Sequence, residues 1–369
     1  MPRRLAQSAV LLVACALLAF AWRCDGPWFA NHVFLPQQFF LPAGSGIVVG
    51  FRAAAVTAAA LLLLVVPRVP RGASAGRLVL GALLSLPAAE IVLRWRIEKV
   101  IRPDLLAATA DLTARHPRYG TTFRPSMDRV EVLSAREIRF QTDGEGRRIP
   151  GAAIDPAAPS LVFTGESAMA GFGLRWEETF AALLGARLRL QVVNLASPSY
   201  RIDQSWLRLA DALPKLERPV AVVGVFMPGL VGRSFAGQLH PPAHPLPFAG
   251  FEFVPPQPPG LLERSGLFRT WSHLYRSDAA IEEGMRSVGA VLSGMASLAK
   301  ARGLPCVFLV TGYTPRWMLH ELFEAPGLDF VVVDLPQDEL LEDGHPGPRG
   351  AIRIAAALES RLRAKLARR

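Results

Sequence analysis

The sequence predicts an α/β protein: a three-layer, flavodoxin-like parallel sheet preceded by an N-terminal bundle of about three transmembrane helices. Two observations support this prediction. In a chain of 369 residues, of which 51% are hydrophobic, the long apolar runs are confined to residues 1–104. From residue 160 onward, short apolar runs alternate with amphipathic stretches, which is typical of a parallel sheet that helices cover on both faces.

Three apolar runs make up the predicted membrane region, residues 1–104, with helices at about 5–22, 43–66 and 78–95. Arg52 interrupts the second run about one third of the way in, but the side chain of one such arginine can extend toward the membrane interface, so it does not exclude a span. The apolar part of the third run would rise only about 24 Å as a helix, against a hydrocarbon core of about 30 Å. It needs Trp95 at the interface to complete a span, and the alternative is a buried or interfacial helix.

Basic residues set the expected orientation of these helices. Arg3 and Arg4 precede the first run, and the loop between the second and third runs carries three arginines, whereas the loop after the first run carries only Arg23. The positive-inside rule then places the N-terminus in the cytoplasm and the C-terminal domain on the extracytoplasmic side of the membrane. The basic cluster at residues 94–102 opposes this orientation, and without a third span the domain would be cytoplasmic.

The net charge of +10 does not indicate nucleic-acid binding, because residues 1–104 alone contribute +7 and their charges flank apolar runs. Of the three cysteines, only Cys306 lies in the globular part, so no internal disulfide and no metal-ligand spacing are available there. We expect no metal and no cofactor. The segment Leu12-Val13-Ala14-Cys15 resembles a lipoprotein cleavage box. However, the chain stays apolar as far as Trp22, where a lipoprotein would usually turn polar, so this alternative is not favoured.

The rest of the chain divides into a linker and lead-in segment, 105–154, and a globular domain, 155–369. A Pro-rich insertion at 228–260 is either a lid over a binding site or a passive surface loop. The sequence pattern predicts strands at 161–164, 191–195, 220–226, 307–311 and 330–334, and helices at 177–188, 204–212, 279–301 and 349–366. Catalytic groups in such sheets lie at the carboxyl ends of the strands.

Ser167 follows the first predicted strand of the globular domain, among small residues and before a helical segment. There its hydroxyl can project from the sheet edge, with nearby backbone amides available to a developing negative charge. The structural alternative is a serine in a turn or at a helix N-cap, which is a very common role.

His345 stands in a Gly/Pro-rich loop before the last predicted helix, two residues after Asp343. A histidine and a carboxylate so placed can supply a general base and the acid that orients it. The alternative is an incidental histidine in a solvated loop.

Taken together, these segments resemble the SGNH (GDSL-like) hydrolase family, in particular its membrane-tethered bacterial members. The resemblance covers about residues 138–369. The family's first block, usually Gly-Asp-Ser, corresponds to Gly165-Glu166-Ser167; the second corresponds to residues 192–200, and the last to Asp343-Gly344-His345-Pro346.

The resemblance implies that Ser167 is the nucleophile, His345 the base and Asp343 the orienting acid. Asp334 is the fallback acid, because it ends a predicted strand and could point to the same edge of the sheet. It also implies an oxyanion hole built from the amides of Ser167 and of the residue at Ser199, where the family has glycine. The family's third donor, an asparagine, falls near Pro228, which has neither an amide proton nor a polar side chain. The Asp-x-His spacing is one residue shorter than the common family spacing.

Two functions follow from this interpretation. The first is a membrane-anchored serine ester hydrolase, or an acyl or acetyl transferase, acting on an extracytoplasmic ester of a glycan or a lipid. The second, motivated by Pro228, is a catalytically silent module of the same fold that binds a glycan or a partner protein in an envelope assembly. The partners expected in the first case are the ester substrate and the lipid bilayer.

Overall fold

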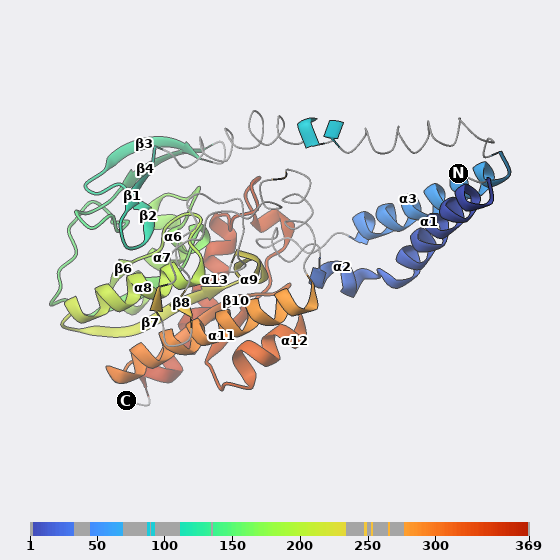
Figure 1. Cartoon of the computed structure of the whole chain (residues 1–369). Helices are drawn as coiled ribbons and strands as arrows, with labels where there is room; N and C mark the ends of the chain where they lie inside the picture. The colour runs from blue at the N-terminus through green and yellow to red at the C-terminus, as the bar shows by residue number, and fades with distance from the viewer. Residues whose placement is uncertain are drawn as a thin grey trace. The chain divides into compact units, whose positions relative to one another are not determined.

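The computed structural model describes residues 3–32, 45–68, 87–88, 90–92, 111–133, 136–233, 247–248, 252–253, 265 and 277–367 (Figure 1). The chain forms two compact units. The first comprises residues 1–35, 42–104 and 259–278, and the second comprises residues 36–41, 105–258 and 279–369.

The described part of the first unit is helical, with α1 (Arg3–Arg23), α2 (Gly26–His32), α3 (Ser45–Val65) and the 3₁₀ turn η1 (Val66–Arg68). The predicted helices at 5–22 and 43–66 correspond to α1 and α3, which pack against each other. Arg52 Nε donates a hydrogen bond of 2.7 Å to the carbonyl oxygen of Ala21 on α1. The predicted third helix, 78–95, lies almost entirely outside the described residues. Within the described ranges, no helix meets the length and apolarity needed to cross a membrane.

The core of the second unit is a five-stranded parallel sheet, which confirms the predicted α/β class. Its strand order is β11-β10-β7-β5-β6. In chain order this is 2-1-3-4-5, the flavodoxin-like arrangement, in which the connections reverse direction between β5 and β7. The strands are β5 (Ser160–Thr164), β6 (Gln191–Asn194), β7 (Pro219–Phe226), β10 (Cys306–Thr311) and β11 (Phe330–Val333).

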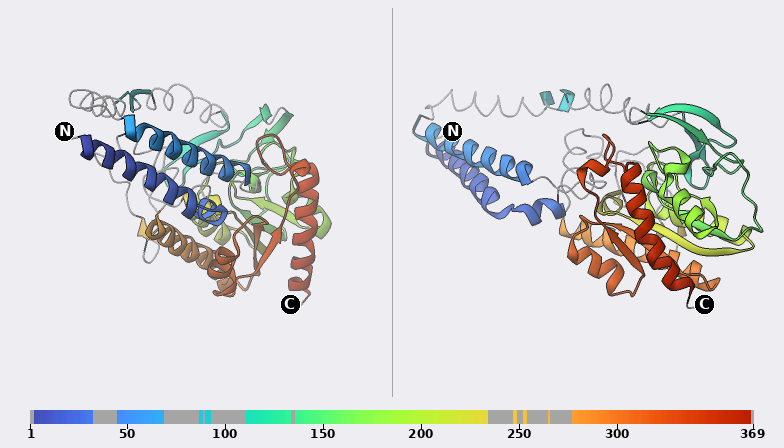
Figure 2. Two further views of the ribbon diagram at one scale, coloured as in Figure 1. Left: turned by 90° about the vertical axis from the view of Figure 1, so that its right-hand side faces the viewer. Right: turned by 180° about the vertical axis from the view of Figure 1, so that it is seen from behind.

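Helices cover both faces of this sheet (Figure 2). On one face α7 and α13 pack against each other and against the sheet, while α8 and α11 lie over the other face. The helical elements are α6 (Ser167–Ala170), η3 (Trp176–Glu178), α7 (Phe180–Leu188), α8 (Ile202–Ala212), η4 (Leu213–Lys215), α9 (Pro228–Arg233), α11 (Asp278–Ala301), α12 (Arg316–Leu319), the π-helical turn η6 (His320–Glu324), η7 (Gln337–Glu339) and α13 (Pro348–Leu366).

The segment predicted as linker and lead-in contains two antiparallel hairpins. They are β1 (Thr113–His116) with β2 (Gly120–Phe123), and β3 (Asp128–Leu133) with β4 (Arg136–Gln141). Phe123 and Phe140 are buried with their rings 4.8 Å apart, so the hairpins share a small apolar core. Arg148 then pairs with Asn194 at the end of β6, which joins this segment to the main sheet.

Only parts of the Pro-rich insertion at 228–260 are described. These are α9 and the short strands β8 (Pro247–Phe248) and β9 (Glu252–Phe253), which pair in antiparallel fashion. The lid function of this insertion therefore stays a prediction.

Candidate active site

Ser167 is the first residue of α6, directly after the carboxyl end of β5. The turn that leads to it requires Gly165, because a Cβ at this position would collide with Val225 of the neighbouring strand. Glu166 is the N-cap of α6, and Gly171 ends the helix with a φ of 71°. The serine is 6% exposed, at the point where the connections of a flavodoxin-like sheet reverse and where such folds bind ligands.

His345 reaches the same edge of the sheet from the loop between η7 and α13. Its Nε2 atom lies 2.8 Å from Ser167 Oγ, although the two residues are 178 positions apart in the chain. The imidazole is 7% exposed, and its ring centroid lies 5.4 Å from that of Phe172, in the loop after α6. The structure therefore holds the histidine in a mostly dry site beside the serine hydroxyl.

Asp343 contacts the other side of His345 through both of its carboxylate oxygens. Oδ2 lies 3.0 Å from the imidazole Nδ1, and Oδ1 accepts a hydrogen bond of 3.1 Å from the backbone amide of His345. The short Asp-x-His spacing thus still allows contact between the two side chains. Asp334, the fallback acid, is an exposed residue that follows β11 and packs against Gly312.

The structure adds a residue to this site to which the sequence analysis assigned no role. The side chain of Glu166 is wholly buried, and its Oε2 atom accepts a hydrogen bond from Ser167 Oγ. Its Oε1 atom accepts a hydrogen bond of 2.9 Å from the Ala168 amide, which caps α6. The available signal was the extra methylene of Glu166 relative to the aspartate of the Gly-Asp-Ser motif that this segment resembles, because it gives the carboxylate enough reach to fold back onto the serine.

The segment after β6 lies beside the nucleophile turn. The Ser197 amide donates to the carbonyl oxygen of Gly165 at 3.4 Å, and the Asn194 side chain donates to the carbonyl oxygen of Met169 at 3.0 Å. Ser199 is exposed and has a φ of 61°, in the left-handed region that favours glycine. The convergence of the Ser167 and Ser199 amides on one oxyanion stays a prediction. Pro228 is the first residue of α9, two positions after the end of β7.

We expect Ser199→Gly to stabilise the protein by up to about 1 kcal/mol, because glycine removes the strain of a left-handed serine at a smaller cost in chain entropy. Thermal unfolding of the full-length chain measures this effect. Ser126→Gly is the matched control, since Ser126 is also exposed, has a φ of 51° and lies between β2 and β3. A destabilised Ser199→Gly protein beside a stabilised Ser126→Gly protein would contradict the expectation.

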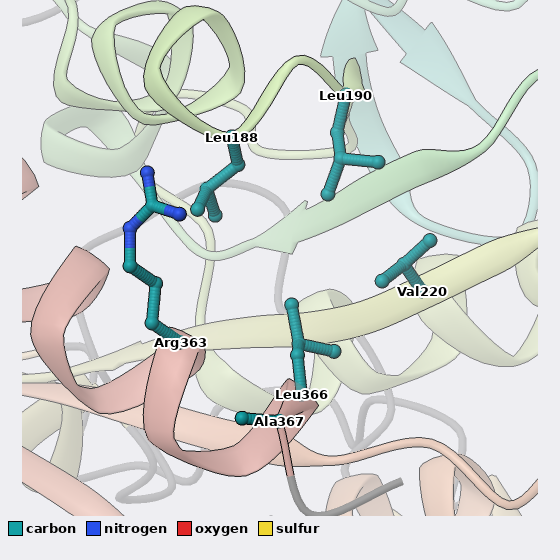
Figure 3. Close-up of a pocket in the computed structure, with 6 residues that line it drawn as sticks. All are labelled: Leu188, Leu190, Val220, Arg363, Leu366 and Ala367. Atoms are coloured by element: carbon teal, nitrogen blue, oxygen red, sulfur yellow. The ribbon is translucent and has the colours of Figure 1, made fainter.

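A surface hollow elsewhere in the second unit is not a candidate for the same chemistry (Figure 3). It contains Leu190, just before β6, and Val220, near the start of β7, so it lies at the amino ends of the strands. Ser167 lies at the opposite, carboxyl ends. The hollow is lined by Leu188, Leu190, Val220, Arg363, Leu366 and Ala367.

Within the residues that the structure describes, no group of three or more His, Cys, Asp or Glu side chains is arranged to hold a metal ion. The arrangement at Ser167 and His345 suits nucleophilic attack by a hydroxyl with an imidazole as proton acceptor.

The sequence matches no protein-family profile and no curated protein. The similar solved structures include an acetyl xylan esterase from Butyrivibrio proteoclasticus, at 14% identity and a TM-score of 0.37, over 58% of this chain and 66% of that one. They also include a lipolytic protein of the G-D-S-L family from Desulfitobacterium hafniense, at 16% identity and a TM-score of 0.34, over 55% of this chain and 98% of that one. AlinE4, an SGNH-hydrolase family esterase, is 14% identical with a TM-score of 0.30, over 58% of this chain and 99% of that one. The geometry of the site itself therefore carries the functional argument.

Proposed function

We propose that this chain is a membrane-anchored serine ester hydrolase or acyl transferase of the SGNH type. The observation that carries the proposal is the 2.8 Å contact between Ser167 Oγ and His345 Nε2, with Asp343 Oδ2 3.0 Å from the other imidazole nitrogen. Nucleophilic acyl transfer requires a hydroxyl beside an imidazole whose orientation a carboxylate fixes.

In this mechanism Ser167 Oγ attacks the ester carbonyl while its proton passes to His345 Nε2. The Asp343 carboxylate stabilises the resulting imidazolium. The imidazolium then gives its proton to the leaving alcohol, and the acyl group stays on Ser167. In the second half a hydroxyl acceptor loses its proton to His345, attacks the acyl-serine and releases Oγ, which recovers the proton. If the acceptor is water the reaction is hydrolysis, and if it is a sugar or lipid hydroxyl the reaction is acyl or acetyl transfer.

The proposed oxyanion hole has two donors, the amides of Ser167 and Ser199. Pro228 stands where a third donor is expected and has no N–H group to offer. Because the loss of one donor costs on the order of a hundred- to a thousandfold in rate, we expect slow turnover of small esters.

The test is covalent labelling of the full-length chain by a fluorophosphonate probe. We expect one label, on Ser167, that is absent in Ser167→Ala. Ser197→Ala is the matched control, because Ser197 is a buried serine on the neighbouring segment and should not change the labelling. The absence of a label on folded wild-type protein would overturn the proposal.

The second candidate function is a catalytically silent SGNH-like module that binds a glycan or a partner protein. Pro228 at the carboxyl end of β7 favours it, because this residue removes the third donor of the oxyanion hole. The same probe distinguishes the two functions, since the silent module predicts no labelled serine and no hydrolysis of aryl esters.

The pattern of burial in α1 and α3 supports membrane anchoring. In a water-soluble helix pair the large apolar side chains lie inside. Here four of the five buried residues among those described on α1 and α3 are alanines, namely Ala14, Ala21, Ala55 and Ala59, and the fifth is Val48. Large ones are exposed, namely Leu11, Leu12, Val13, Leu18, Phe20, Trp22, Val49, Phe51, Val56, Leu61, Leu63 and Leu64. Membrane helices pack through small residues and turn large apolar side chains to the lipid.

We propose on this basis that lipid contacts α1 and α3 and that the second unit lies on the extracytoplasmic side, where the substrate is an ester of a glycan or a lipid. Retention of the full chain in the membrane fraction after alkaline carbonate washing is the expected result. An alkaline phosphatase fusion at the C-terminus should be active, since this reporter folds only outside the cytoplasm. Release by carbonate, or an inactive fusion, would contradict the anchoring or the orientation respectively.

A further inference from the structure

Glu166 and His345 contact the same atom from two sides. Glu166 Oε2 accepts a hydrogen bond from Ser167 Oγ, and His345 Nε2 lies 2.8 Å from that Oγ. The other carboxylate oxygen of Glu166 accepts from the Ala168 amide at 2.9 Å, so both oxygens are held in place. All three side chains of the contact are buried.

The number of protons available decides what this arrangement means. A serine hydroxyl has one proton, and an ionised carboxylate can only accept hydrogen bonds. When the hydroxyl donates to Glu166, the contact with His345 is a hydrogen bond only if Nε2 is the donor. Nδ1 faces the carboxylate of Asp343 at 3.0 Å, which favours a proton on that nitrogen as well. The imidazole then carries both protons and has no lone pair with which to take a proton from Ser167.

We propose that Glu166 is a positioning residue that holds the Ser167 hydroxyl proton away from His345 in the resting site. This inference rests on the proposed function, because it concerns the triad of Ser167, His345 and Asp343 and explains how that triad is restrained in the resting site. A hydrogen bond to a carboxylate is roughly twice as strong as one between neutral groups, so the resting arrangement is favoured.

The productive arrangement is reached by the shift of two protons and needs no further reactant. The hydroxyl proton moves from Ser167 Oγ to Glu166 Oε2, and the proton on His345 Nε2 moves to Oγ. Glu166 is then a neutral acid that donates to Oγ, the serine donates to Nε2, and the imidazole is a neutral base. The number of protons and the total charge of the four side chains are the same before and after.

Glu166→Gln imitates this productive arrangement. The Ala168 amide can only donate, so it selects the carbonyl oxygen of the glutamine and turns the amide nitrogen toward Ser167 Oγ. The serine must then donate to His345. The cap of α6 is kept, so the variant should fold. We expect phosphonylation by the fluorophosphonate probe and hydrolysis of aryl esters to become about tenfold faster, because one charge-assisted hydrogen bond no longer has to be given up.

The experiment compares the full-length wild type, Glu166→Gln, His345→Ala and the double variant. The acceleration should require His345 and vanish in the double variant. A rate for Glu166→Gln that is unchanged or lower than that of the wild type would overturn the inference, and a lower rate would indicate that Glu166 itself takes the proton.

Nitrogen-15 NMR of histidine-labelled protein supplies a readout that does not depend on catalysis. We expect His345 Nε2 to carry a proton in the wild type and to lose it in Glu166→Gln. An identical protonation state in both proteins would overturn the inference. If neither protein is labelled by the probe but Nε2 still loses its proton in the variant, the proposed function fails and the proton-holding role of Glu166 stands.

Discussion

Replacing His345 with alanine is expected to lower the rate of ester hydrolysis by between about a hundredfold and ten-thousandfold, the contribution typical of a positioned general base. The reason is geometric, because no other part of the proposed mechanism receives the Ser167 proton and returns it to the leaving group. The measurement is kcat/KM of the full-length protein on a short-chain aryl ester. His345 does not belong to the turn that carries Ser167, so the fold around Ser167 should survive the substitution.

The matched control is His320→Ala. His320 belongs to the surface turn η6, where its exposed ring contacts Glu324, so its loss should leave the rate within a factor of two or so of the wild type. Equal rates for the wild type and His345→Ala would rule out the triad mechanism even if Ser167 still reacted with the probe.

The sheet could be predicted from the sequence because its strands are buried on both faces. A strand of this kind appears as an unbroken apolar run, and the run predicted at 220–226 is β7, Pro219–Phe226. The helices between the strands keep an amphipathic period, so α11 and α13 also begin and end within a residue or so of the predicted bounds.

The hairpins β1–β4 escaped prediction for a physical reason. Polar and apolar residues alternate in β3, but the apolar ones, Val130 and Val132, are exposed, so the pattern does not mark a buried face. Their short strands become stable through the ring contact of Phe123 with Phe140 and through the link of Arg148 to β6. Both contacts join residues that are distant in sequence, and no local pattern reveals them.

The residues of the candidate site also differ in how well the sequence predicts their roles. Ser167, Asp343 and His345 lie in short segments whose residue types already indicate their chemistry. The role of Glu166 depends on the direction of one side chain, which is fixed by the Ala168 amide and by the Ser167 hydroxyl. A capping carboxylate has the same sequence signature whether or not it also reaches the nucleophile, so only the three-dimensional arrangement distinguishes the two cases.

Arg148 fixes the loop that follows the nucleophile helix, and its replacement should have the largest effect on stability. Its guanidinium is wholly buried, lies 4.0 Å from the centre of the Phe140 ring, and donates to the carbonyl oxygens of Ala170, Gly171 and Leu174 at 2.5–2.8 Å. Burial lowers the pKa of this group to about 9, so it is still charged at neutral pH.

We expect Arg148→Met to lower the free energy of unfolding by at least about 3 kcal/mol, because each buried carbonyl that loses its donor costs about 1–3 kcal/mol. Chemical denaturation of the full-length chain measures this loss.

The matched control is Arg136→Met, which removes a partly exposed arginine that pairs with Glu178 and donates to the Gly173 carbonyl oxygen of the same loop. Its loss should cost less, about 1–2 kcal/mol, because it removes the donor of one carbonyl rather than three, together with a partly exposed ion pair. Similar losses for the two variants would show that the guanidinium of Arg148 does not hold this loop. A large loss for Arg148→Met alone, with slower probe labelling of the protein that remains folded, would show that the lead-in segment positions Ser167.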